Sequence, residues 1–252
     1  MYDEFSSDYD RFVNWAGRLA VELPFLERQL HGVGAKRVLD AACGTGQHAI
    51  ALARRGFEAV GADLSAGMID RARANAKAEG VPGGFVVAGF GELLAKVGGG
   101  FDALLCLGNS LSHLLTPFDL AAALADFAAC LRPGGLLLIQ NRNFDRVLAR
   151  QERWTEPQSH REGDREWLFL RFYDFRPDGL LDFHVVTLHR QGQEAWTQRI
   201  ASSPLWPQRE AELTAALAEA GLIGVTLYGD LAGAPFQPES SPNLVITARR
   251  KE

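Results

Sequence analysis

The chain has 252 residues, of which 47% are hydrophobic and 23% charged, enough for a well-packed globular core with an insertion. Its net charge of −5 argues against nucleic acid or an anionic membrane as a partner and favours small ligands. Three widely spaced cysteines are typical of reduced cytoplasmic thiols. The N-terminal stretch has no signal-peptide pattern and no apolar run spans a membrane, so we expect a soluble, cytoplasmic protein.

Between residues 37 and 140, short apolar runs alternate with helical periods. The runs predict strands at 37–41, 57–63, 84–89, 101–108 and 136–140. The periodic segments predict helices at 48–55, 66–79, 91–97 and 117–131, and "RPGG" at 132–135 marks the boundary after the last of them. Strands that are apolar on both faces and separated by helices indicate an α/β, doubly wound, mostly parallel sheet.

After residue 140 the pattern changes to alternating apolar and polar residues at 166–175, 180–190 and 194–203. This alternation predicts an inserted antiparallel β subdomain with one wet face. A helix at 207–221 and strands at 222–229 and 243–250 then complete a seven-stranded core sheet as an antiparallel pair. We therefore expect four parts: an N-terminal helical cap (1–34), a core (35–145), an inserted lid (150–204) and the completion of the core (205–252).

A glycine-rich loop follows the first strand, where backbone N–H groups and a helix N-terminus can meet a ligand. Gly44, Gly46 and Ala49 satisfy the dinucleotide pattern G-x-G-x-x-G/A, and Asp63 stands where a ribose-binding acid belongs, so NAD fits. Asp40, just before the loop, would repel a pyrophosphate but attract a cation. S-adenosylmethionine (SAM) has no phosphate and carries an ammonium and a sulfonium, so the two acids favour SAM.

The stretch "VLDAACGTG" (38–46) resembles the first motif of the class I SAM-dependent methyltransferases, and the element order resembles their Rossmann-like core. The resemblance implies that Gly44 and Gly46 approach the methionine part of SAM and that Asp63 holds the ribose. The family often has an acid followed by a bulky apolar residue at the adenine edge, and Gly89 and Phe90 stand at these positions here. Any contact to the adenine amino group is therefore expected from the backbone or from water. The cofactor-binding residues expected on this basis are Arg18, Asp40, Ala42, Gly44, Gly46, Asp63, Leu64, Met68, Gly89, Phe90 and Leu107.

A narrower resemblance lies in "CLGNSLSHL" (106–114) and "NRNFDRVL" (141–148), which look like segments of the glycine N-methyltransferase family and its bacterial relatives. It implies that Arg142 clamps a substrate carboxylate, as bidentate guanidinium chemistry permits, and that Asn109 positions the amine. Asp145 is the alternative, internal partner for Arg142. His113 is either a structural histidine or, for a hydroxyl nucleophile, the general base.

The aromatic hydroxyls that this family places in its inserted sheet are fewer here. Ser202 and Ser203 stand where we expected them, and Phe172, Phe175 and Phe183 outnumber Tyr173. This composition predicts a more apolar lid over a larger or greasier substrate than glycine. The N-terminal stretch offers Tyr2, Tyr9, Trp15 and Arg18 instead, and Arg18 is expected to meet the carboxylate of SAM.

We expect a SAM-dependent methyltransferase of small molecules, with an amino-acid-like, carboxylate-bearing amine (glycine/sarcosine type) as the favoured substrate and Asn109, Arg142 and His113 as catalytic residues. No metal is expected, because the histidines lack ligand spacing. Three alternatives stay open: O- or N-methylation of another metabolite, an NAD-dependent oxidoreductase, and a non-catalytic SAM-binding protein. The oligomeric state is also open, a homo-oligomer included.

Overall fold

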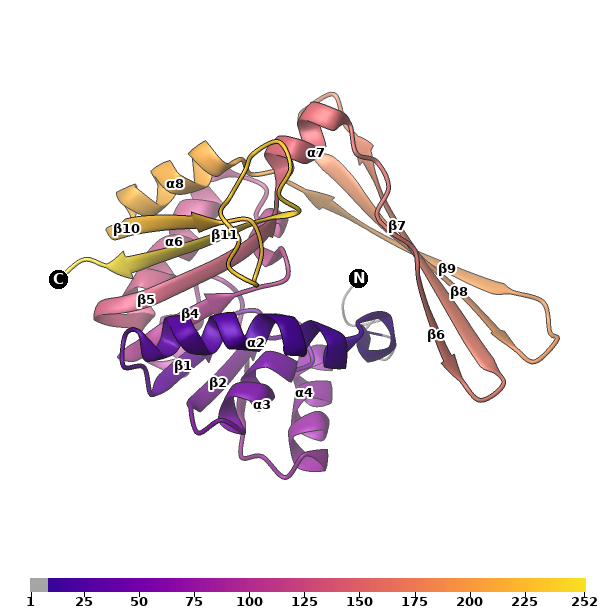
Figure 1. The fold of residues 1–252 in the computed structure, drawn as a ribbon, viewed down its shortest axis with the longest axis horizontal. Helices are drawn as coiled ribbons and strands as arrows, with labels where there is room; N and C mark the ends of the chain where they lie inside the picture. The colour runs from indigo at the N-terminus through magenta and orange to yellow at the C-terminus, as the bar shows by residue number, and fades with distance from the viewer. Residues whose placement is uncertain (1–8) are drawn as a thin grey trace.

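The computed structural model describes residues 9–252 and contains a seven-stranded sheet and a separate four-stranded sheet (Figure 1). The strand order of the larger sheet is β10-β11-β5-β4-β1-β2-β3. Strands β1 to β5 are parallel, and β11 runs antiparallel to both β5 and β10. Its strands are β1 (Arg37–Asp40), β2 (Glu58–Asp63), β3 (Gly84–Val87), β4 (Phe101–Cys106), β5 (Leu131–Arg142), β10 (Leu222–Tyr228) and β11 (Asn243–Arg250).

Three of the helices that follow core strands begin where a side chain caps the first turn. Ser65, Thr116 and Asn143 each accept a hydrogen bond from a backbone N–H of the helix that follows. The helices are α2 (Trp15–His31), α3 (Gln47–Ala53), α4 (Ala66–Ala78), α5 (Leu93–Val97), α6 (Pro117–Cys130), α7 (Phe144–Arg150) and α8 (Glu210–Glu219), with a 3₁₀ turn η1 at Ser110–His113.

Both faces of the parallel sheet are buried, because successive residues of each strand point to opposite sides. Leu104, Leu137 and their neighbours on one face pack against apolar side chains of α5, α6 and α8. Leu105, Leu138 and their neighbours on the other face pack against α2 and α3. The core therefore holds the carboxyl ends of the strands rigidly at one edge.

The four-stranded sheet, called the lid below, is an antiparallel meander of β6 (Gln158–Glu162), β7 (Arg165–Phe175), β8 (Leu181–Gln191) and β9 (Thr197–Leu205). In Figure 1 it extends away from the core as a long twisted sheet and is reached from β5 through α7. Trp167, Phe169 and Val185 of its inward face pack with Tyr9 and Phe12. Aromatic packing thus joins the lid to the N-terminal segment.

The predicted fold class is confirmed: a mostly parallel seven-stranded sheet carries an antiparallel insertion. Two details of the prediction are wrong. Strand β6 was not expected, and "RPGG" lies inside β5 rather than before it. Pairing with β4 jumps from Phe101–Leu131 to Ala103–Leu136, so the proline and glycines sit in an irregularity of the ladder that needs fewer N–H donors. Within residues 9–252, no helix is long and apolar enough to cross a membrane.

Candidate active site

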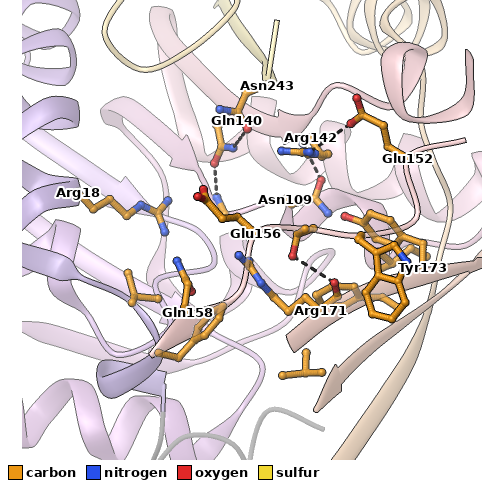
Figure 2. Close-up of a pocket in the computed structure, with 18 of the residues that line it drawn as sticks. Arg18, Asn109, Gln140, Arg142, Glu152, Glu156, Gln158, Arg171, Tyr173 and Asn243 are labelled. Atoms are coloured by element: carbon orange, nitrogen blue, oxygen red, sulfur yellow. Dashed lines mark hydrogen bonds and ion pairs between the residues drawn. The ribbon is translucent and has the colours of Figure 1, made fainter. Parts of the chain in front are cut away.

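Two adjoining cavities open at the carboxyl ends of the parallel strands, where open α/β sheets bind ligands. The first, here called the loop cavity, has a volume of about 600 Å³ and lies beside the glycine-rich loop. The second, the lid cavity, has about 890 Å³ and lies between the core and the lid (Figure 2). Tyr9, Gly108 and His113 line both, so the two cavities meet at these residues.

The glycine-rich loop uses its two glycines for different purposes. Gly44 lines the loop cavity with a φ of +53°. Gly46 does not line it: its N–H donates to Cys43 O, and a Cβ there would lie 2.8 Å from the Phe85 ring. Gly46, with a φ of +81°, is therefore required by backbone conformation and close packing. The sequence placed both glycines against the ligand, but the cavity reaches only Gly44.

Asp63 at the end of β2 is held in place by the backbone. Its two carboxylate oxygens accept hydrogen bonds from the N–H groups of Gly44 and Ser65, each at 2.9 Å. The carboxylate also lines the loop cavity, and a carboxylate oxygen can accept more than one hydrogen bond. Further residues of the predicted cofactor set line the same cavity, namely Ala42, Leu64, Met68, Gly89, Phe90 and Leu107.

Asp40 is buried beneath the loop and does not line either cavity itself. Neither of its carboxylate oxygens has a hydrogen-bond partner among the described residues. Burial raises the pKa of Asp40 to about 6, against the opposing effect of His48. A buried carboxylate without a partner is costly, so this position favours a nearby positive charge.

Behind Asp40 lies a charged cluster that the sequence analysis did not identify. The ring nitrogen Nε2 of buried His48 lies 2.7 Å from Glu22 Oε2, and Arg18 Nε donates to Glu22 Oε1 at 2.9 Å. Burial raises the pKa of Glu22, but the hydrogen bond from His48 and the charge of Arg18 outweigh it and lower the pKa overall. Arg18 lines the lid cavity, paired with Glu22.

Asn109 connects the end of β4 to the end of β5 through hydrogen bonds of its side-chain amide. Its Oδ1 accepts the N–H of Arg142 at 2.8 Å, and its Nδ2 donates to Ser112 Oγ at 2.8 Å. Gly108 beside it donates its N–H to Gln140 Oε1. Asn109 has a φ of +69°, a strained conformation that is typical of functional loops. Both ends of its amide are engaged, so its visible contacts position Arg142.

Arg142 extends from the end of β5 into the lid cavity (Figure 2). Its Nη2 lies 3.5 Å from Glu152, which also pairs with Arg146 at 2.9 Å. The internal partner expected from the sequence was wrong, because Asp145 instead pairs with Arg209 and accepts the N–H of Glu210. The Nε of Arg142 is buried without a hydrogen-bond partner among the described residues. One edge of the guanidinium is thus left for another acceptor.

His113 lies at the junction of the two cavities. Burial lowers its pKa to about 4, so the imidazole is neutral at neutral pH. Its Nδ1 lies 3.3 Å from Ser203 Oγ. The hydroxyls of Ser203, Tyr9 and Tyr173 belong to residues that line the cavities, whereas the predicted Tyr2 lies outside the described residues.

The sequence analysis also missed Arg171 of β7, which lines the lid cavity (Figure 2). A signal was present: in "REWLFLRFYDF" the residues at 167, 169, 173 and 175 are aromatic, and Arg171 is the one charge that interrupts this aromatic row. No group of three potential metal-binding side chains occurs among residues 9–252.

Comparisons with known proteins point to one family. A model for a methyltransferase domain matches residues 38–135. The chain is 30% identical over 249 residues to the glycine/sarcosine N-methyltransferase of Aphanothece halophytica, covering 98% of this chain and 88% of that relative. It is 40% identical over 146 residues to the glycine/sarcosine N-methyltransferase of Parasynechococcus marenigrum (strain WH8102), covering 58% of this chain. That match spans about half the length of the relative, 52%.

A solved structure supports the fold. The S-adenosylmethionine-dependent methyltransferase from Clostridium acetobutylicum ATCC 824 superposes with a TM-score of 0.80 at 14% identity, covering 100% of this chain and 99% of that one. Its likeness covers the lid as well as the core, so the two sheets and their connection recur together in this fold.

Proposed function

Because this chain belongs to the class I SAM-dependent methyltransferases, in the family of the glycine/sarcosine N-methyltransferases, we propose that it transfers a methyl group to the amine of a small amino-acid-like molecule. The observation that carries the proposal is Arg142, a cation at the end of a central strand whose Nε has no hydrogen-bond acceptor among residues 9–252. The relatives named above as glycine/sarcosine N-methyltransferases support the same substrate class.

The loop cavity fits the cofactor of this family. Asp40 is a buried carboxylate without a side-chain partner among residues 9–252, which suits a ligand that carries an ammonium and a sulfonium. Asp63 has a fixed carboxylate with acceptor capacity for ribose hydroxyls. Leu64, Met68 and Phe90 supply apolar walls for a flat base. We propose that these residues hold SAM, with Arg18 near its carboxylate.

The lid cavity would hold the acceptor. In this proposal Arg142 binds the acceptor carboxylate, and Asn109 keeps Arg142 in position through its backbone N–H. Tyr9, Gly108 and His113, at the junction of the cavities, border the place where the acceptor nitrogen would lie. The lid and the N-terminal segment would exclude water from that place.

When bound, SAM supplies a methyl carbon activated by its sulfonium. Transfer needs a neutral amine lone pair in line with that carbon, so alignment and dehydration can account for the catalysis. Neutral His113 can accept a hydrogen bond from the amine, which orients the lone pair. With a pKa of about 4 it is a weak base, and this disfavours the alternative of a hydroxyl acceptor.

The test is a direct assay of the full chain with SAM and separate amines, read by mass spectrometry of the acceptor. We expect N-methylation of amino acids and little of their methyl esters, because the esters cannot pair with Arg142. Calorimetric titration with S-adenosylhomocysteine checks the cofactor site independently. Binding of S-adenosylhomocysteine without methylation of any amino acid would leave the cofactor assignment standing and overturn the proposed substrate class.

A further inference from the structure

Arg171 occupies a position that the pattern of β7 reserves for buried apolar side chains. Residues 167, 169, 171 and 173 share one side of the strand, and Trp167, Phe169 and Tyr173 on that side are buried. Val185, the residue opposite Arg171 on β8, is buried too. A cation is therefore placed in the middle of the inward, aromatic face of the lid.

The guanidinium of Arg171 makes no hydrogen bond or ion pair that the structure records among residues 9–252. Its Nε is shielded from solvent, and its contact is with the ring of Phe12, whose centroid lies 4.7 Å from Cζ. By contrast, Arg161, Arg165 and Arg190 of the same sheet each pair with a carboxylate. A buried cation without an anionic partner costs stability, so a functional reason is needed.

The environment of Arg171 also holds a second positive group. Burial lowers the pKa of Arg171, and the charge of Arg142 lowers it further against the opposing effect of Tyr173, so the two guanidiniums repel each other. They come from different parts of the molecule, Arg142 from the end of β5 and Arg171 from the lid, and both line the cavity of about 890 Å³ (Figure 2). Of the acids that line this cavity, Glu22 pairs with Arg18 and His48, and Glu152 pairs with Arg142 and Arg146. Glu156 makes no recorded ion pair with Arg171 among residues 9–252.

We propose that the methyl acceptor carries a second anionic group, a carboxylate or a phosphate, which binds Arg171 while the amino-acid carboxylate binds Arg142. This inference rests on the proposed function and narrows its substrate class to acidic amino acids. Glycine, the smallest amino acid, has no second anionic group to pair with Arg171 and would fill only a small part of a cavity of about 890 Å³. Bidentate binding of each anion would relieve the repulsion between the two cations.

The first experiment compares acceptors that differ only in the second charge. Purified full chain and SAM are given aspartate or asparagine, glutamate or glutamine, and O-phosphoserine or serine, and initial rates yield kcat/KM. We expect the acidic member of at least one pair to exceed its neutral partner about 10- to 100-fold, mainly through KM. A preference within the phosphoserine pair alone identifies phosphate as the second group, and one within the carboxylate pairs identifies carboxylate.

The second experiment removes the cation with Arg171→Met, which keeps the length of the side chain. The acidic acceptor should lose about 10- to 100-fold in kcat/KM and in calorimetric affinity measured with S-adenosylhomocysteine present, while its neutral partner changes little. S-adenosylhomocysteine alone should bind within about twofold of wild type. The melting temperature of the ligand-free variant should equal or exceed that of wild type, because a buried unpaired charge is gone. Arg161→Met, on the same sheet, is the matched control and should alter none of these.

Three results would overturn the inference. Equal kcat/KM for the two members of every acceptor pair would show that the acceptor needs no second anionic group. Equal losses for acidic and neutral acceptors in Arg171→Met mean that both arginines share one carboxylate. Weakened S-adenosylhomocysteine binding with unchanged acceptor preference assigns Arg171 to the cofactor. In each of these cases amino acids are still methylated, so the proposed function survives; methylation of no amino acid would instead end the proposed function.

Discussion

The loop cavity and the lid cavity differ in how their polar groups are held. In the loop cavity, Asp63 is fixed by two backbone N–H groups and the walls come from short connections after β1, β2, β3 and β4. In the lid cavity, Arg142 and Arg171 come from segments far apart in the chain, and atoms of both lack a protein partner. Groups fixed by the backbone suit one fixed ligand, whereas arginines with unpartnered atoms on separate elements mark the part that decides which second ligand is accepted.

The largest effect should come from the lid cavity. Arg142→Leu should lower kcat/KM for carboxylate-bearing amines, because a charged partner is lost in a closed site. The loss corresponds to about 2 to 4 kcal/mol of transition-state stabilisation. The fold should survive, since Glu152 keeps its ion pair with Arg146. Calorimetry with S-adenosylhomocysteine should show unchanged cofactor affinity.

Methyl esters of the same amines supply the control for Arg142→Leu and should respond little to the substitution. If wild-type protein methylates an amino acid and its methyl ester equally well, the carboxylate clamp is wrong. A large drop in melting temperature with unchanged KM would instead make Arg142 a structural residue.

Asp40 tests the electrostatics of the loop cavity. Because its pKa is about 6, SAM affinity should fall below pH 6, by about 10- to 30-fold in all, as the carboxylate is protonated and loses its attraction for the cationic cofactor. Asp40→Asn should weaken SAM binding about 10- to 30-fold at pH 8 and remove this pH dependence. Titration calorimetry at several pH values measures both.

The stability of the ligand-free protein should move in the opposite direction. A carboxyl group whose folded pKa is raised binds more protons in the folded than in the unfolded state, so its contribution to stability falls as pH rises from about 4 to about 6. Asp40→Asn should therefore be the more stable protein above pH 6, by about 1 to 3 kcal/mol. Equal pH profiles for both proteins would show that Asp40 does not titrate near 6.

Asp10 holds the N-terminal segment, whose Tyr9 lines both cavities, against the core. Its carboxylate accepts hydrogen bonds from Thr45 Oγ1 (2.6 Å), Arg71 Nε (3.0 Å) and Asn75 Nδ2 (3.0 Å). Asp10→Ala should weaken S-adenosylhomocysteine binding by about five- to tenfold and speed hydrogen exchange in residues 9–14. Asp70→Ala removes an exposed acid from α4, the helix that carries Arg71 and Asn75, and is the control. Unchanged exchange would mean that Asp10 does not anchor this segment.

The smallest effect should be at His113, between the cavities. With a pKa of about 4 it does not titrate near neutrality, so His113→Asn should change kcat less than about threefold and leave the pH–rate profile from pH 6 to 9 unaltered in shape. Steady-state rates across that range measure it. If the pH–rate profile of the variant lacked an ionisation that the wild-type profile shows, His113 would act as a general base.

The loop cavity was largely predictable because neighbouring residues in the sequence build it. Glycines after an apolar strand and an acid at the end of the next strand carry their geometry locally, which is why Gly44 and Asp63 were found. Gly46 was predicted to approach the ligand as well, since the sequence pattern does not distinguish a glycine that faces a ligand from one that faces Phe85 and Ala72. That distinction depends on how α4 and β3 pack against the loop.

The sequence by itself determined the fold class and the family, since hydrophobic period and loop chemistry are local properties. Only the tertiary structure decided the partners of the charges: Glu152 rather than Asp145 beside Arg142, and His48 with Arg18 around Glu22. It also brought Arg171, 29 positions beyond Arg142, to the same cavity. Burial and long-range contact set the cost of a charge, and neither can be read from a residue's neighbours in the chain.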